Sequence, residues 1–124
     1  MSENNAISVM GLNHFFGEGE ARKQAIWDVN LNVMRGSLTI LMGPSGSGKT
    51  TLLTLMGCLR HVQEGSVNLL GHELNGALDA QLMLLRRRLG FIFQAHNLLP
   101  YLTALENVRM GLEVHERWME QGRT

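Results

Sequence analysis

The stretch Gly43-Pro44-Ser45-Gly46-Ser47-Gly48-Lys49-Thr50 decides the fold. A glycine, four residues, then glycine, lysine and threonine is the pattern of a phosphate-binding loop. Its glycines let successive backbone N–H groups point into one anion-sized hollow, which also faces the positive end of a following helix. Lys49 can reach the β- and γ-phosphates of a nucleotide, and the Thr50 hydroxyl can ligate Mg²⁺. Further backbone or hydroxyl donors are expected from Ser45, Gly46, Ser47, Gly48 and Thr51.

The residues on either side of this loop favour the same interpretation. The near-continuous apolar run Leu38-Thr39-Ile40-Leu41-Met42 predicts a strand buried on both faces, as in a parallel sheet. Lys49 to Met56 is predicted to form a helix that Gly57 ends. The four fixed positions of the pattern, Gly43, Gly48, Lys49 and Thr50, rarely occur by chance between a buried strand and a helix. In contrast, Gly17-Glu18-Gly19 lacks the third glycine of a dinucleotide-binding motif.

The rest of the chain predicts further short strands and helices. Strands are expected over 7–12 and 26–33, with a glycine-containing turn over 14–20 between them, and over 65–70 and 90–93. A helix is expected over 78–89, because leucines 78, 82, 85 and 89 share one face, with Arg86, Arg87 and Arg88 in its last turn. Residues 94–100 are expected to be a loop, and Thr103 to Glu106 matches a capping box that starts another helix.

Composition limits the class of protein. The chain has 124 residues, of which 44% are hydrophobic, and eleven basic residues balance eleven acidic ones. This excludes a disordered or collagen-like chain and argues against a protein that binds nucleic acid by neutralising phosphates. The single cysteine, Cys58, is expected to be a small buried hydrophobe, and the polar start of the chain does not resemble a signal peptide. We therefore expect an intracellular protein that reaches a membrane only through a partner.

Three segments together resemble the ATP-binding subunits of ABC transporters. Phe16-Gly17 looks like the A-loop, whose aromatic ring stacks on adenine, with Phe15 as the alternative. Gly43 to Thr51, extended by Leu52-Leu53, is similar to the Walker A segment. Phe91 to Gln94, followed by the runs Asn97 to Pro100 and Thr103 to Val108, looks like the Q-loop and its sequel.

The resemblance implies a fold and a set of ligands. The fold is an α/β P-loop NTPase of the ABC nucleotide-binding type, and the chain would hold its N-terminal half, ending after the Q-loop helix. Antiparallel strands would occupy about 1–37, the P-loop core 38–100, and the start of a helical subdomain 101–124. The expected ligands are ATP, bound by Phe16, residues 43–51 and Gln94, and Mg²⁺, bound by Thr50 and Gln94. An amide such as that of Gln94 can ligate a hard cation or accept from water without adding charge.

Within that family the chain resembles the macrolide and lipoprotein exporters. They share its Asn-Leu-Leu-Pro and Leu-Thr-Ala-x-Glu-Asn-Val runs, while Val62 to Gly65 and Gln94 to Pro100 look nearer still to the heterocyst glycolipid exporters of the DevA type. The resemblance implies a membrane-spanning subunit, a second ATP-binding subunit and a membrane fusion protein as partners. It also implies a peripheral location on the cytoplasmic face of the membrane and an exported lipid or hydrophobic cargo.

Several family motifs do not occur in this sequence. There is no Leu-Ser-Gly-Gly signature or switch histidine, and neither aspartate, Asp28 or Asp79, follows the apolar strand of a Walker B motif. We therefore assign no catalytic residue and expect no hydrolysis by this chain alone. Two alternatives stay open, a non-hydrolysing nucleotide-binding or interaction remnant and a P-loop kinase. The five histidines show no metal-ligand spacing, and the Arg86 to Arg88 cluster is interpreted as a solvated helix end.

Overall fold

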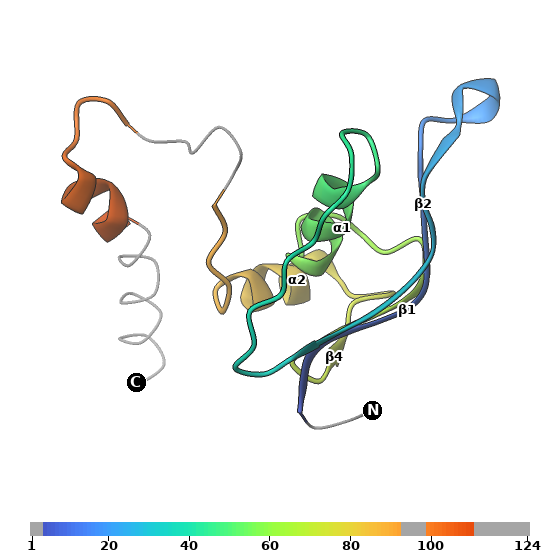
Figure 1. The fold of residues 1–124 in the computed structure, drawn as a ribbon, viewed down its shortest axis with the longest axis horizontal. Coiled ribbons are helices and arrows are strands. Elements are labelled where there is room, and N and C mark those ends of the chain that lie inside the picture. Colours follow the sequence, from blue (N-terminus) through green and yellow to red (C-terminus); the bar gives the residue numbers. More distant parts are fainter. Residues whose placement is uncertain (1–3, 93–98, 111–124) are drawn as a thin grey trace. The chain divides into compact units, whose positions relative to one another are not determined.

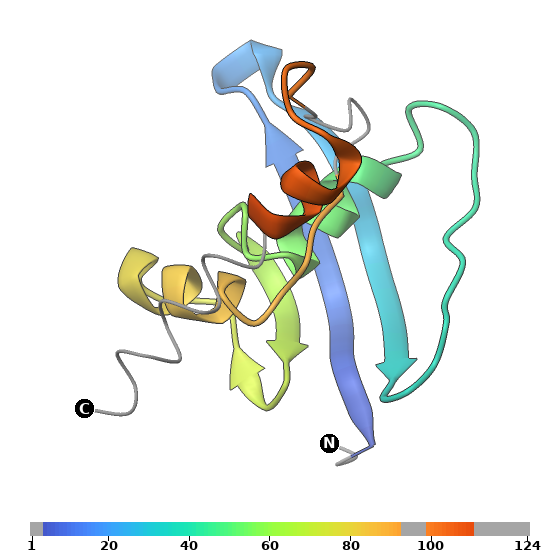
Figure 2. The ribbon, with the colours of Figure 1, turned by 90° about the vertical axis from the view of Figure 1, so that its left-hand side faces the viewer.

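The computed structural model describes residues 4–92 and 99–110. The chain divides into two compact units, Met1–Met83 and Leu84–Thr124. The first unit contains a four-stranded antiparallel sheet (Figure 1), and Figure 2 shows its strands in the order β2-β1-β3-β4. Its strands are β1 (Asn5–Phe16), β2 (Lys23–Met34), β3 (Glu64–Leu69) and β4 (His72–Glu73).

The long hairpin of β1 and β2 confirms the two predicted strands and extends them. The pairs Ile7 with Val33 and Val9 with Leu31 place alternating apolar residues on one face. The ladder continues to the pair of Phe16 with Lys23, so His14 to Phe16 belong to β1 rather than to the predicted turn. The turn itself holds the short 3₁₀ helix η1 (Gly19–Ala21).

Helix α1 (Lys49–Met56) covers the residues that the sequence predicts. Gly57 ends it, and its N–H donates to the carbonyl of Leu53. The helix lies against one face of the hairpin (Figure 2) and contacts β2 and β3. The core of this unit consists of apolar side chains from the sheet and α1, and its fully or nearly fully buried members include Val9, Leu12, Ile26, Leu52, Leu55, Val67 and Leu69. Cys58 is fully buried, as predicted.

Gly65 marks the point where β3 approaches β1 most closely. A β-carbon built on Gly65 would lie 2.3 Å from the carbonyl oxygen of Gly11, and the φ of Gly65 is +93°. Only glycine fits both conditions, because a side chain would collide with backbone and the left-handed conformation disfavours it. The two glycines let the sheet twist at this position, where the pairing of β1 with β3 shifts its register.

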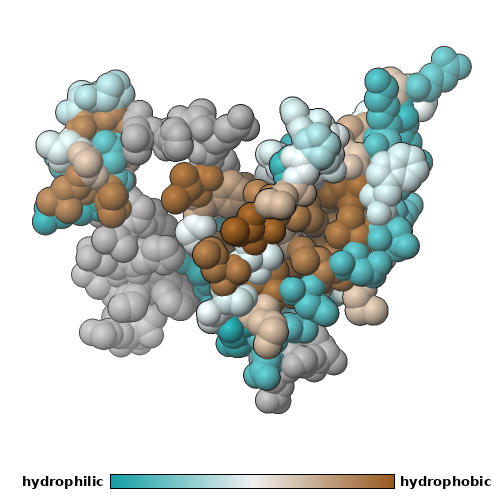
Figure 3. All heavy atoms as spheres, in the orientation of Figure 1, coloured by the Kyte–Doolittle hydropathy of each residue, from teal (hydrophilic) through white to brown (hydrophobic). Residues whose placement is uncertain are grey.

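The prediction of a buried strand over 38–42 is wrong for this structure. These residues form no strand, and Leu38, Ile40 and Met42 are 91%, 74% and 83% exposed. A strand exists only where a neighbour supplies hydrogen bonds, and no strand among the described residues pairs with this run. Apolar residues consequently gather on the face of the molecule that Figure 3 shows.

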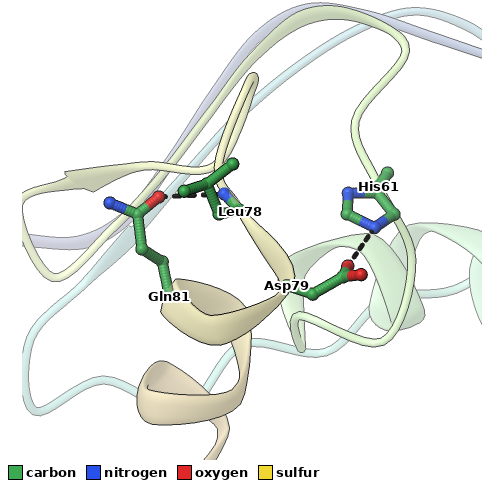
Figure 4. A network of polar contacts seen from close by, with 4 residues as sticks. All are labelled: His61, Leu78, Asp79 and Gln81. Carbon is green, nitrogen blue, oxygen red and sulfur yellow. Dashed lines mark hydrogen bonds and ion pairs between the residues drawn. The ribbon is translucent and has the colours of Figure 1, made fainter.

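Helix α2 (Asp79–Arg86) is shorter than the predicted helix over 78–89. Leu78 precedes it, and its N–H donates to the side-chain oxygen of Gln81 at 2.9 Å, which satisfies one donor at the helix start (Figure 4). Leu82 and Leu85 are buried, whereas Leu78 is exposed. Residues 87–88 form a turn, so Arg86 alone of the three arginines lies in the helix.

The predicted strand over 90–93 is absent in its described part, since residues 90–92 have no regular structure. Phe93 lies outside the described residues. The predicted capping box is confirmed: the Glu106 N–H donates to Thr103 Oγ1 at 3.2 Å, and the Thr103 N–H donates to Glu106 Oε1 at 3.0 Å. These two bonds begin a helix over 104–110. Within the described ranges, no helix is both long and apolar enough to cross a bilayer.

Candidate functional site

The loop from Gly43 to Gly48 leads directly into α1, and its glycines have the conformation that such a turn requires. Gly46 and Gly48 have φ values of +82° and +92°. Gly48 caps α1, and its carbonyl accepts the first helical hydrogen bond, from Leu52 N–H at 2.9 Å. A β-carbon on Gly48 would lie 2.7 Å from the carbonyl oxygen of Ala25 in β2. The loop is therefore held against the hairpin at a position where only glycine fits.

Backbone donors in this loop lack partners within the described protein. The Ser47 N–H donates to the carbonyl of Pro44 at 3.2 Å, but no acceptor in the described part of the chain receives the N–H groups of Ser45, Gly46 or Gly48. The first N–H groups of α1 are likewise without intrahelical acceptors. A cluster of unpaired donors at a helix N-terminus is an anion-binding cradle.

The Lys49 side chain folds back into this loop. Its ammonium group donates to the carbonyl oxygens of Gly43 and Pro44, the latter at 2.8 Å, and lies 3.4 Å from Ser47 Oγ. The loop carbonyls thus hold a cation at the mouth of the cradle. An incoming phosphate can replace them as acceptors, because the ammonium has three donors on a flexible stem.

A hollow of about 400 Å³ lies beside the loop, and the loop itself forms part of its wall. Apolar residues, among them Ile26, Trp27 and Leu52, line the rest of the hollow, while Gly43, Pro44, Ser47, Gly48 and Lys49 line the loop side. The charges of a phosphate need donors, which the loop side offers and the apolar side does not. The loop side of the hollow is therefore the part that suits an anion.

The predicted adenine-binding ring, Phe16, lies at the end of β1 and is 37% exposed. Arg60 Cζ lies 4.9 Å from its ring centroid, and the His14 ring meets it edge-on at 4.8 Å between centroids. Phe15, the alternative, carries Arg22 over its ring at 3.9 Å. Both phenylalanines line one hollow of about 520 Å³, together with residues of the segment after α1.

His14 is buried beside this hollow, and its Nδ1 atom has no hydrogen-bond partner within the described residues. Burial, and secondarily the positive charge of Arg60, lower the pKa of His14 below its usual value. The side chain is therefore neutral in the folded chain at neutral pH.

Two side chains of the segment after α1 connect it to β1, and the sequence analysis did not identify either. The Gln63 amide accepts from the Phe15 N–H at 2.8 Å and donates to the Phe15 carbonyl at 2.9 Å. Arg60 lies over the Phe16 ring and also donates from its Nε to Thr54 Oγ1 of α1 at 3.1 Å. The contacts with Phe15 and Phe16 join residues far apart in sequence, so no local pattern could have predicted them.

The structure locates two more of the residues that are predicted to bind the nucleotide or Mg²⁺. Thr50 is exposed in the first turn of α1, directly after Lys49. Thr51 is half-buried in the same turn. Gln94 lies outside the described residues. In the portion of the chain that the structure describes, no three histidine, cysteine or acidic side chains gather to hold a metal ion.

Comparison with known proteins identifies the fold family. A family model described as ABC transporter matches residues 26–124. The macrolide export ATP-binding/permease protein MacB of Aggregatibacter actinomycetemcomitans is 45% identical over 107 residues, which are 86% of this chain and 17% of that protein. The lipoprotein-releasing system ATP-binding protein LolD of Zymomonas mobilis is 42% identical over 111 residues, which are 89% of this chain and 48% of LolD.

A solved structure agrees with these matches. The dimeric post-hydrolysis state of the ATP-binding cassette MJ0796 of Methanocaldococcus jannaschii, bound to ADP and Pi, superposes with a TM-score of 0.78 at 40% identity. The match covers 88% of this chain and 47% of that one. The chain thus spans less than half the length of each of these three proteins. Its fold is that of the P-loop ABC ATPases, as predicted, and it belongs to the ABC transporter family, with exporter ATPases of the MacB and LolD type among its relatives.

Proposed function

We propose that this chain binds MgATP as part of the ATP-binding subunit of an ABC exporter, which drives transport through a membrane-spanning partner. The observation that carries the proposal is the loop 43–48, where backbone N–H groups have no acceptor in the described part of the chain and the Lys49 ammonium donates to loop oxygens. An anion of several charges satisfies both sets of donors at once. ATP is favoured among such anions because an exposed aromatic ring, Phe16, lies in the same unit.

Each proposed ligand has a separate task. Lys49 transfers its hydrogen bonds from the loop carbonyls to the β- and γ-phosphates, and the backbone of residues 43–51 surrounds those phosphates. Thr50 supplies a hydroxyl to Mg²⁺, and Gln94 supplies an amide oxygen. Phe16 stacks on adenine, which contributes on the order of 1–3 kcal/mol by analogy with base stacking on aromatic side chains.

The proposed partners rest on the names of the relatives and on the resemblance described in the sequence analysis. MacB and LolD are named for macrolide export and lipoprotein release, and MJ0796 is described as a dimer. We infer a membrane-spanning subunit, a second copy of the ATP-binding subunit and a membrane fusion protein as partners, on the cytoplasmic face of the membrane. A lipid or other hydrophobic cargo fits these relatives, and the finer likeness to heterocyst glycolipid exporters stays a prediction.

The test measures the melting temperature of the 124-residue chain with and without MgATP. At about 100 times Kd, a ligand that binds only the folded state stabilises it by roughly 2.7 kcal/mol. Lys49→Ala should remove most of that gain. Arg35→Ala is a matched control, because it also removes one exposed cation but lies outside the loop. An unchanged melting curve of the wild-type chain with MgATP would show that the cradle assignment is wrong.

A second candidate function is nucleotide binding without hydrolysis, in a remnant that pairs with a transporter. The positions of the two aspartates favour it: Asp28 is exposed on β2, and Asp79 begins α2 and faces His61 at 2.7 Å. Neither follows an apolar strand towards the loop. Phosphate release measured in the same samples distinguishes the two, because hydrolysis that depends on Lys49 would exclude the non-hydrolysing function.

A further inference from the structure

Arg60 occupies an unusual place in the first unit, since it contacts both the end of β1 and helix α1. Its guanidinium lies over Phe16, and its Nε donates to Thr54 Oγ1. Thr54 in turn donates from that hydroxyl to the carbonyl of Thr51 at 2.7 Å. Thr51 belongs to the proposed phosphate-binding segment, so a chain of contacts runs from the aromatic ring to the phosphate loop.

The Phe16 ring is partly exposed and has a cation beside it. Its exposed fraction is 37%, and Arg60 Cζ lies 4.9 Å from the ring centroid. The His14 ring makes a T-shaped contact with it at an interplanar angle of 73°. The exposed part of the ring is the surface available to a planar base, and the guanidinium lies next to it.

Gln63 strengthens the same connection through the backbone. Its amide makes a reciprocal pair of hydrogen bonds with the N–H and carbonyl of Phe15. The end of β1 is thus connected to the segment after α1 by the two hydrogen bonds of Gln63 and by the contact of Arg60 with the Phe16 ring. Since that segment leaves α1 directly, these contacts connect the Phe16 ring to the helix that follows the phosphate loop.

We propose that Arg60 is a positioning residue for the nucleobase, which holds Phe16 in the place where adenine stacks and fixes its distance from the phosphate loop. The inference rests on the proposed function, because it assigns a role within the nucleotide site. The proposed role of Arg60 concerns the nucleobase and not the phosphates. Substitution of Arg60 is therefore expected to lower the affinity for ATP and to leave the affinity for a bare phosphate chain unchanged.

The experiment compares two probes, MgATP and inorganic tripolyphosphate with Mg²⁺, by calorimetric titration of the 124-residue chain. Phe16→Ala should raise the Kd of ATP between about fivefold and 150-fold, which corresponds to loss of one base stack. Arg60→Met should raise it about two- to fivefold, as expected for a cation–π contact at an exposed site. Neither change should alter the Kd of tripolyphosphate.

Three further variants separate positioning from general stability. Arg60→Lys keeps a cation for the ring and should recover part of the ATP affinity. Thr54→Val removes the hydroxyl that accepts from Arg60, so it should raise the Kd of ATP and leave the Kd of tripolyphosphate unchanged. In the double variant with Arg60→Met it should raise the Kd of ATP little further. Arg22→Met is the matched control, because it removes the equivalent cation from Phe15. It should leave the Kd of ATP unchanged.

The outcomes are distinct. The role of Arg60 would be overturned if Arg60→Met weakened the affinity for both probes equally. It would also be overturned if Arg22→Met, and not Arg60→Met, raised the Kd of ATP. If the wild-type chain binds neither probe, the proposed function is wrong and this inference fails with it. If it binds both equally, and Arg60→Met changes neither affinity, the phosphate cradle stands while the role of Arg60 is excluded. A melting curve for each variant establishes that it is folded at the titration temperature.

Discussion

The close approach of Gly48 to β2 gives the sharpest prediction about how the phosphate loop is built. Gly46 and Gly48 both have left-handed conformations, with φ values of +82° and +92°. Their surroundings differ: a β-carbon on Gly46 would meet nothing within 4 Å, whereas one on Gly48 would lie 2.7 Å from the Ala25 carbonyl oxygen. The two positions therefore separate the effect of conformation from the effect of a collision.

The expected magnitudes follow from that difference. Alanine in the left-handed region costs roughly 1–2 kcal/mol, and this is the whole expected loss for Gly46→Ala. Gly48→Ala has the same conformational cost and must also displace a carbonyl of β2, for which overpacking data suggest a further 1–3 kcal/mol. We therefore expect losses of about 1–2 kcal/mol for Gly46→Ala and about 2–5 kcal/mol for Gly48→Ala.

The assay is urea unfolding of the 124-residue chain and both variants, followed by far-ultraviolet circular dichroism. Equal slopes with different midpoints would show that the variants differ in stability alone. Gly48→Ala should also abolish the stabilisation by MgATP, since the loop can no longer lie against β2. If Gly48→Ala is no less stable than Gly46→Ala, the contact between the loop and β2 does not hold the loop in place, and the reasoning fails.

Two further predictions concern titration and helix capping. Burial and Arg60 lower the pKa of His14, so the unfolded chain takes up a proton below pH 6.5 that the folded chain refuses. The free energy of unfolding should fall from pH 6.5 towards the folded pKa, at up to about 1.4 kcal/mol per pH unit. His14→Leu should remove that slope in urea titrations, and a slope that survives the substitution would assign it to another group. In the second unit, the Thr103 N–H lowers the pKa of Glu106, so the capping bond is present above pH 4.5 and lost as the pH falls through the folded pKa. Thr103→Ala should speed amide exchange over 104–110 about fivefold at neutral pH, for the roughly 1 kcal/mol of such a cap, and unchanged exchange would contradict that role.

The parts of the fold that the sequence predicts correctly are those fixed by neighbouring residues. Helix α1 needs only the phosphate loop before it, helix-forming leucines within it and Gly57 after it, and its observed bounds match the prediction. The hairpin of β1 and β2 likewise needs alternating residues and a glycine-containing turn. Helix α2 was predicted less well, because Leu78 and Leu89 have the spacing of its apolar face but lie outside the helix. Spacing alone does not locate a helix end, which depends on how backbone donors and acceptors are satisfied.

The run over 38–42 shows why a buried strand is harder to predict. Its apolar composition is typical of a strand that is buried on both faces. Such a strand also needs neighbouring strands that hydrogen-bond to it and helices that pack on its faces, and the composition of the run does not show whether these are present. In this structure the run is exposed, and the hollow beside it is lined by Leu41, Met42 and Trp27. The chain spans less than half the length of MacB, LolD and MJ0796. We propose that in the complete fold neighbouring strands pair with 38–42 and cover its apolar side chains.

The candidate site divides in the same way between local and distant contributions. The phosphate cradle is local, because the loop and the first turn of α1 supply its donors and Lys49 its charge. The base site is not local: Phe16 could be predicted from its resemblance to the A-loop, but Arg60 and Gln63 follow only from contacts across more than forty residues. Hydrolysis requires still more, a carboxylate that orients water beside the γ-phosphate. With Asp28 on an exposed strand and Asp79 facing His61, neither aspartate takes that position. We therefore propose that the contacts described above serve nucleotide binding, and the measurement of phosphate release tests hydrolysis separately.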